Sequence, residues 1–154
     1  MSKMTLTTEG DTHVVITRQF KAAPEAVYRA HTEAALLQKW LLGPDGWTMP
    51  HCISEPFPGG KIRYDWANGE GAGFYVEGHY VEVEAPRRLV HIERMFLPDP
   101  TPENHVETVF EAKDGGTLMT MRMTLPDEQT RAMMLGSGME LGMEASYVRL
   151  DDMS

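Results

Sequence analysis

Histidine is the side chain best suited to acid–base chemistry at neutral pH, and this sequence carries six of them. No two histidines form an HxxxH or HExxH pair, so the sequence lacks a helix-borne metal site. His79 and His91 are predicted to face each other across neighbouring strands. Because no carboxylate-rich ligand spacing accompanies them, we interpret the histidines as solvent-facing or hydrogen-bonded and predict no metal site.

The motifs of nucleophilic catalysis and phosphate binding are also missing, because the sequence contains no GxSxG, P-loop or GxGxxG pattern. The single cysteine, Cys52, excludes an intramolecular disulfide and is interpreted as a small buried hydrophobe. Glutamates such as Glu77 and Glu93 lie on alternating predicted strands and are expected on the solvent side. We therefore assign no catalytic residue and no cofactor, and we favour a non-enzymatic protein.

Arg18 shares one face of its predicted strand with Val14, Ile16 and Phe20. A charge at such a position is most often an edge residue that reaches water. The alternative is a polar anchor inside a cavity, where its guanidinium would orient a ligand. Arg18 is therefore our best candidate for ligand selectivity.

Methionine is frequent, with 12 in 154 residues, and several occupy positions expected to face inward. Three line one face of the last predicted strand, and two lie on the apolar stripe of the final helix. Methionines fill a plain core well, and they also form soft pockets that adapt to varied apolar ligands, so both interpretations stay open. Glycines in the final helix favour the pocket slightly, because they remove side-chain volume. The predicted ligand-binding residues are Arg18, Trp47, Tyr64, Trp66, Met119, Met121, Met123, Met139, Met143 and Tyr147.

The final segment, residues 127–153, has apolar residues at the spacing of a long amphipathic helix that begins at the N-cap candidate Asp127. Three glycines inside it each cost about 1 kcal/mol relative to alanine. They indicate a frayed, late-starting helix, a close approach of the backbone to a neighbour, or room left for something else. Met134, Leu141 and Val148 recur every seven residues on the opposite face. This line predicts a weak homodimer; the alternative is packing against the short helices or a loop.

The elements that must position these residues follow a simple order: one strand, two short helices, about six antiparallel strands and the long helix. Residues 1–11 are expected to be loose. Pro24 marks the first short helix, Thr32 is expected to cap the second, and a bulge is expected near Gly78. The predicted strands are 13–20, 47–54, 61–66, 74–84, 89–96, 106–112 and 117–125. We therefore predict an α+β fold, in which a curved antiparallel sheet of about seven strands wraps around the C-terminal helix.

Composition limits the possible partners. A chain of 154 residues is expected to form a single domain, 1–154. Its net charge of −9 argues against nucleic acid or an anionic membrane as a partner, because both need a basic patch. The sequence has no apolar run long enough for a membrane span, and MSKMTLTTEG is not a secretory signal. We expect a cytoplasmic protein.

Four segments carry a resemblance to a known family, in this order: KWLLGPDGWTMP, FPGGKIRYDW, GHYVEVEAPRRLVHIERM and GMELGMEASYVRL. Over roughly Val14 to Leu150 the chain resembles the START/Bet v 1-like (SRPBCC) superfamily. Within it, the chain is similar to the branch named after the C-terminal domain of the activator of the Hsp90 ATPase. The resemblance implies a helix-grip fold with a cavity between the sheet and the helix. Met143 stands where the family usually has tryptophan, so the size of that cavity can differ here.

The resemblance implies several functions, because members bind lipids or hydrophobic small molecules, catalyse cyclisation or hydrolysis, or assist chaperones. We favour binding of a hydrophobic small molecule or lipid, fatty-acid-like or aromatic, in that cavity. The alternatives are an enzyme of the polyketide-cyclase or hydrolase type and a chaperone-associated stress-response module. The enzyme is disfavoured by the missing nucleophile motif, and the chaperone module by the lack of room for a second domain.

Overall fold

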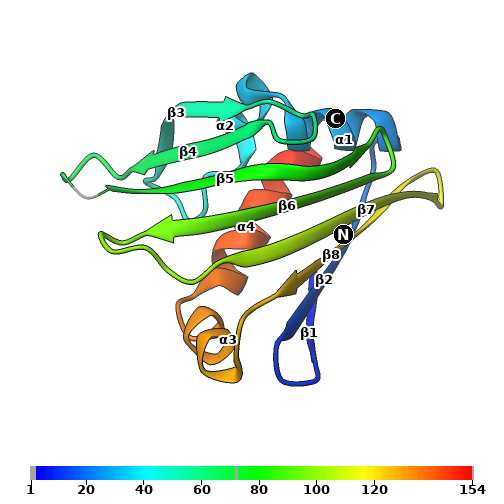
Figure 1. Ribbon diagram of the computed structural model, residues 1–154. Helices are drawn as coiled ribbons and strands as arrows, with labels where there is room; N and C mark the ends of the chain where they lie inside the picture. Colours follow the sequence, from blue (N-terminus) through cyan, green and yellow to red (C-terminus); the bar gives the residue numbers. More distant parts are fainter. Residues whose placement is uncertain (1–2, 72, 154) are drawn as a thin grey trace.

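An eight-stranded antiparallel sheet and four helices form the computed structural model, which describes residues 3–71 and 73–153 (Figure 1). The elements are β1 (Thr5–Glu9), β2 (His13–Phe20), α1 (Pro24–Thr32), α2 (Ala34–Trp40), β3 (Thr48–Ser54), β4 (Lys61–Ala67), β5 (Gly73–Glu84), β6 (Arg88–Phe96), β7 (Asn104–Lys113), β8 (Gly116–Thr124), α3 (Glu128–Leu135) and α4 (Met139–Asp152).

The strands follow the order β1-β2-β8-β7-β6-β5-β4-β3 across the sheet. Strands β3 to β8 form a meander, whereas α1 and α2 carry the chain from β2 to the far edge where β3 begins. Figure 1 shows α4 crossing one face of the sheet, with α1 and α2 near its C-terminal end and α3 at its N-terminal end. The helix-grip α+β fold is therefore confirmed.

The sheet has one strand more than the expected seven, because part of the segment expected to be loose forms β1. This strand pairs with β2, and Leu6 lies opposite Ile16. The turn between the two strands contains Gly10, whose φ of 53° lies in the left-handed region that glycine favours. The rest of β1 is mostly exposed, so its sequence carries little of the alternation that reveals a strand. Residues 1–2 of that prediction lie outside the described chain.

The predicted long C-terminal helix is two helices, α3 and α4, and this corrects the sequence prediction. Its start is confirmed, because the Asp127 side chain accepts a hydrogen bond from the Thr130 N–H at 2.7 Å. The chain then breaks at Gly138, whose φ of 85° is incompatible with a continuous right-handed helix. The break removes Met134 from the predicted heptad line: Met134 packs against the core, while Leu141 and Val148 stay exposed.

Two local predictions about the strands and helices are also corrected. The predicted bulge in β5 is present, but the register shifts between Tyr80 and Glu82, beyond Gly78. A Cβ atom at Gly78 would lie 2.0 Å from the Ile92 carbonyl oxygen, so close backbone approach explains that glycine. Thr32 does not cap α2, because its hydroxyl donates to the Tyr28 carbonyl within α1 instead.

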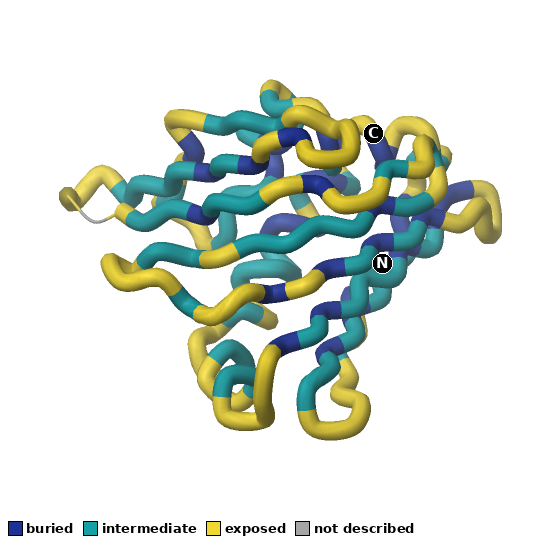
Figure 2. Tube along the Cα trace, viewed as in Figure 1, coloured by how far each residue is buried: buried dark blue, intermediate teal, exposed yellow. Residues whose placement is uncertain are grey.

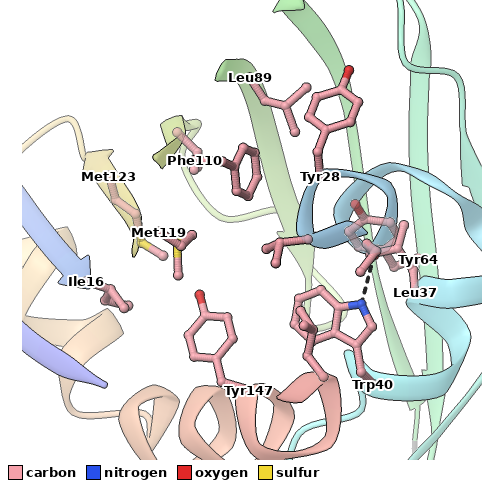
Figure 3. Packing of buried hydrophobic residues seen from close by; sticks show 14 of the residues in the cluster. Ile16, Tyr28, Leu37, Trp40, Tyr64, Leu89, Phe110, Met119, Met123 and Tyr147 are labelled. Carbon is pink, nitrogen blue, oxygen red and sulfur yellow. Dashed lines mark hydrogen bonds between the residues drawn. The ribbon is translucent and has the colours of Figure 1, made fainter. Parts of the chain in front are cut away.

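The core lies between the concave face of the sheet and the helices, and short buried stretches alternate along the strands with half-buried and exposed ones (Figure 2). Tyr147 rises from α4 towards Met119, with Trp40 beside it (Figure 3). The Tyr147 ring stacks on Trp40 at 5.9 Å and meets the edge of Phe20 at 5.5 Å. The Trp40 indole donates to the Ala30 carbonyl at 2.8 Å, which joins α2 to α1. These contacts fix the C-terminal half of α4 on the sheet.

Candidate ligand site on the concave face

The three methionines of β8 face inward together, as predicted. Met119 and Met123 are buried, whereas Met121 between them is half-buried. Strand register places Met121 opposite Ile16 on β2 and Thr108 on β7, both of which are buried. The row therefore lines the concave face, and its middle member keeps access to solvent.

Burial along α4 changes from one end of the helix to the other. Met139 and Met143 in the first turns are half-buried, while Tyr147 and Leu150 further on are fully buried. On the strands, too, some inward-facing residues are buried and others are only half-buried. We call five residues on these elements the half-buried set. They are apolar, face inward and pack on the core, but each stays partly exposed to solvent: Trp66, Met95, Met121, Met139 and Met143.

Trp47 and Trp66 meet at the ring of Phe74. Trp47 lies just before β3, and its ring meets the edge of Phe74 at a centroid distance of 5.3 Å. Trp66 stacks on the same ring at 5.0 Å and donates its indole N–H to the Leu41 carbonyl at 2.8 Å. Trp66 is thereby held in one orientation at the end of β4, and it gives the half-buried set a preorganised aromatic surface.

Arg18 faces inward, but its guanidinium is occupied by the C-terminal helix. Its Nη1 donates to the Gln19 carbonyl at 2.7 Å and lies 3.6 Å from Asp151 Oδ2. Its Nε lies 3.9 Å from Glu144 Oε1. The residue is 3% exposed, and the guanidinium carbon lies 5.1 Å from the centre of the Phe20 ring. Arg18 therefore holds α4 on β2, and two carboxylates balance its charge.

A polar group on β6 and β7 was missed by the sequence analysis. Leu89, His91, Glu93 and Met95 alternate on the same face, so the imidazole and the carboxylate both point inward. His91 Nε2 lies 2.6 Å from Glu93 Oε1 and donates to it. Asn104 lies opposite Glu93 in the register and is 5% exposed. The sequence signal for this inward position was that Glu93 lies on the same face of the strand as the apolar Leu89. A carboxylate on a strand usually lies on the solvent side instead.

Two tyrosines complete this polar group with hydroxyls that stay protonated. The Tyr80 hydroxyl lies 2.8 Å from Ser54 Oγ, and burial raises its pKa to about 12. Burial also raises the pKa of Tyr64 well above its ordinary value, with smaller contributions from Tyr80 and Glu93. Burial raises the pKa of the Cys52 thiol to about 11, so the thiol is unreactive at neutral pH.

Comparison with known proteins assigns the family. A family model described as "Activator of Hsp90 ATPase homolog 1-like protein" matches residues 21–154. This chain belongs to that family. The match confirms the assignment to the START/Bet v 1-like superfamily. No protein with a curated functional description matches the chain.

Solved structures agree with the assignment to the activator-like family. A crystal structure of a Rhodobacter sphaeroides protein is 32% identical, with a TM-score of 0.92 over 98% of this chain and 97% of that one. A Mycobacterium smegmatis protein is 20% identical, with a TM-score of 0.86 over 97% and 94% of the two chains. The solution structure of an "AHSA1-like protein" from Aeromonas hydrophila is 19% identical, with a TM-score of 0.76 over 92% and 93%. The last two show the fold alone.

The histidines of this activator-like chain are arranged differently from the prediction. His79 pairs with Ile92 and His91 with Tyr80, so the two histidines do not face each other. His31 lies between Trp40 and Phe110, at centroid distances of 4.9 Å from each ring, and its Nδ1 donates to the Val27 carbonyl. Burial lowers the pKa of His31 to about 4, which keeps the ring neutral.

Within residues 3–71 and 73–153, no three His, Cys, Asp or Glu side chains are grouped to hold a metal ion. No helix of the same ranges is long and apolar enough to cross a membrane. Surface depressions of about 210 and 240 Å³ lie over Gly78 and Glu93 and at the β7–β8 hairpin, and neither is lined by a predicted ligand-binding residue. Neither depression is lined by a member of the half-buried set.

Proposed function

We propose that this member of the activator-like family binds a small apolar or amphipathic molecule between the concave face of the sheet and α4. The observation that carries the proposal is the half-buried set, which is apolar and inward-facing yet keeps access to solvent. Each methylene group of a ligand that these side chains cover contributes about 0.8 kcal/mol. We expect micromolar affinity, about −8 kcal/mol.

The part of the half-buried set that can move most easily lies at the N-terminal end of α4. Four of the five members of the half-buried set are methionines, whose unbranched side chains change rotamer at small cost. Helix α3, which precedes α4, contains no fully buried residue and contacts the core through the half-buried Met134 and Leu135, so it is held less firmly than α4. Further along, Ser146 and Arg149 fix α4 to Gly43 through hydrogen bonds of 2.9 and 2.6 Å. Because these contacts hold the later part of α4 in place, we expect a ligand to reach the half-buried set beside α3.

The test is a binding screen with a filled-site variant. Lipids, flavonoids and polyketide-like acids are screened by thermal shift, and hits are confirmed by chemical-shift changes in NMR spectra. Met121→Trp should fill the space and abolish binding while the fold is kept. Met133→Trp is the matched control, because Met133 on α3 is 69% exposed. A ligand that binds Met121→Trp as well as wild type, or an absence of hits across the panel, would overturn the proposal.

Acid–base catalysis is the second candidate function, and the His91–Glu93 hydrogen bond of 2.6 Å favours it. With Nε2 donating to the carboxylate, His91 Nδ1 is left as a base that can accept a proton from a bound substrate. The Tyr64 and Tyr80 hydroxyls would donate hydrogen bonds to a developing enolate. Deuterium exchange at the central carbon of a β-diketone tests this activity. Exchange that His91→Gln leaves unchanged would exclude it.

The outer face of α4 is a candidate surface for contact with another protein. Leu141 and Val148 are exposed there, at 79% and 44%. We propose a weak homodimer through these two residues; contact with a chaperone, which the family's description implies, is the alternative occupant of the surface. Cytoplasmic location stays a prediction from the sequence.

A further inference from the structure

We propose that the head group of the bound molecule is a protonated amine, held by Glu93 and Asn104. This inference rests on the proposed function, which supplies the apolar body of the ligand. It adds the chemical class of the polar end, and it replaces the fatty-acid-like head that the sequence analysis expected.

The two acceptors lie side by side on the concave face. Glu93 on β6 and Asn104 on β7 are direct partners in the strand register, so their Cβ atoms are about 5 Å apart. On its other side, Glu93 is paired with Gly78, which has no side chain to cover the carboxylate. Met95 follows two residues after Glu93 on the same face and belongs to the half-buried set. The polar group therefore adjoins the proposed site of the apolar body.

Both residues have acceptor capacity left over. His91 donates to Glu93 Oε1, and no described residue donates to Oε2. Asn104 Oδ1 is buried, and within the described chain it has no hydrogen-bond partner. A buried carbonyl oxygen without a donor is costly and is normally satisfied by a protein group, a water or a ligand. An ammonium group carries three donors and no acceptor, which matches a carboxylate beside an amide oxygen.

The charges around the site disfavour an acidic head group. Arg18 is a cation that faces this interior, and the carboxylates of Asp151 and Glu144 already lie 3.6 and 3.9 Å from it, although its buried Nε donates to no described residue. The side chain of Glu93 is 23% exposed and accepts a hydrogen bond from His91, so a bound carboxylate would meet it as a like charge. The neighbouring Tyr64 and Tyr80 hydroxyls are neutral donors or acceptors and do not reverse this preference.

Three probes with one body and different heads test the inference: octylamine, octan-1-ol and octanoic acid. Affinities are measured at pH 7 by NMR titration of the whole chain. We expect octylamine to bind at least about tenfold more tightly than octanoic acid, with octanol between them. Glu93→Gln should make the amine and the alcohol bind alike. Asn104→Asp should strengthen amine binding and weaken acid binding, which a merely destabilised variant would not do.

A control separates this preference from general attraction of a cation to a chain of net charge −9. Glu111→Gln removes the same charge from an exposed position on β7 and should keep the full preference. Equal binding of the three probes, tighter binding of the acid, or equal losses in Glu93→Gln and Glu111→Gln would overturn the inference and leave the proposed function standing. Binding of none of the three would overturn both.

Discussion

Arg18 Nη1 on β2 lies 3.6 Å from Asp151 Oδ2 on α4, and this buried ion pair joins the first half of the sheet to the last helix. The other oxygen of Asp151 accepts a hydrogen bond from the Lys21 N–H at 2.9 Å. Glu144, nearer the N-terminal end of α4, makes two contacts of the same kind. Its Oε1 faces Arg18 Nε, and its Oε2 accepts a hydrogen bond from the Met4 N–H at 2.8 Å. Each carboxylate thus serves a buried charge and a backbone donor at once.

Loss of Asp151 should therefore destabilise the protein strongly. We expect Asp151→Ala to lower the free energy of unfolding by about 3 kcal/mol, because it leaves the Arg18 charge buried with a weaker partner. Urea denaturation measures the change. Arg18→Met combined with Asp151→Ala should cost less than the sum of the single changes. A cost of Asp151→Ala below about 0.5 kcal/mol, the range of ordinary surface changes, would show that the pair is not coupled to folding.

His31 should make stability depend on pH between its unfolded and folded pKa values. The unfolded pKa is 6.5, and burial lowers the folded pKa to about 4, so the unfolded state binds the proton more readily. The contribution of the neutral ring is complete above pH 6.5 and is lost as the pH falls towards 4, by about 3 kcal/mol.

Denaturant unfolding from pH 7 to 4 checks the contribution of His31. His31→Phe keeps an aromatic ring between Trp40 and Phe110 and should flatten this part of the curve. The nearby His91, which contributes a smaller part of the lowering of the His31 pKa, is retained in both proteins. Parallel curves for the variant and wild type would contradict the prediction.

Two glycines of the C-terminal segment should respond to alanine with opposite signs. Gly138 has a φ of 85°, and we expect Gly138→Ala to destabilise the fold by about 1 kcal/mol. At Gly142, inside α4, a Cβ atom would meet Pro44 Cδ at 3.6 Å, an ordinary contact. Gly142→Ala should therefore stabilise the protein by up to about 1 kcal/mol through helix propensity. Thermal unfolding of the two variants side by side measures both, and equal shifts would refute the assignment of the break to Gly138.

Leu141→Glu tests the proposed contact between two copies of the chain. If α4 forms the interface, the mass measured by analytical ultracentrifugation at high concentration should fall to that of a monomer. Stability should stay the same, because Leu141 is 79% exposed in the single chain. Met133→Glu on α3 is the control for an exposed apolar residue outside the interface. Unchanged mass would remove α4 as the interface.

The sequence predicted most elements because their patterns are periodic. On β2, Val14, Ile16 and Phe20 alternate with half-buried residues, and the structure buries all three. The register between strands was not predictable in the same way. A shift between Tyr80 and Glu82 decides that His91 faces Tyr80, and no residue type marks its position.

The polar part of the candidate site was missed for a related reason. Glu93 was assigned to solvent, since a carboxylate on a strand usually lies there. Glu93 lies on the same face of β6 as Leu89, and this face is known to be the inward one only when the pairing with β5 and β7 is known. Arg18 was placed on the inward side correctly, but its partners on α4 lie more than a hundred residues away in the chain, so its pairing could not be foreseen.

The pairing of β2 with β8 has a consequence for how the chain folds. His13 and Thr124, whose side chains are 3.0 Å apart, are separated by 111 positions in the sequence. During synthesis, the β1–β2 hairpin therefore leaves the ribosome long before its partner strand exists. The meander from β3 to β8 is built from local hairpins, which form quickly, whereas closure onto β2 is a late event with a high loop entropy. Until that closure, the apolar face of Val14 and Ile16 needs protection from aggregation.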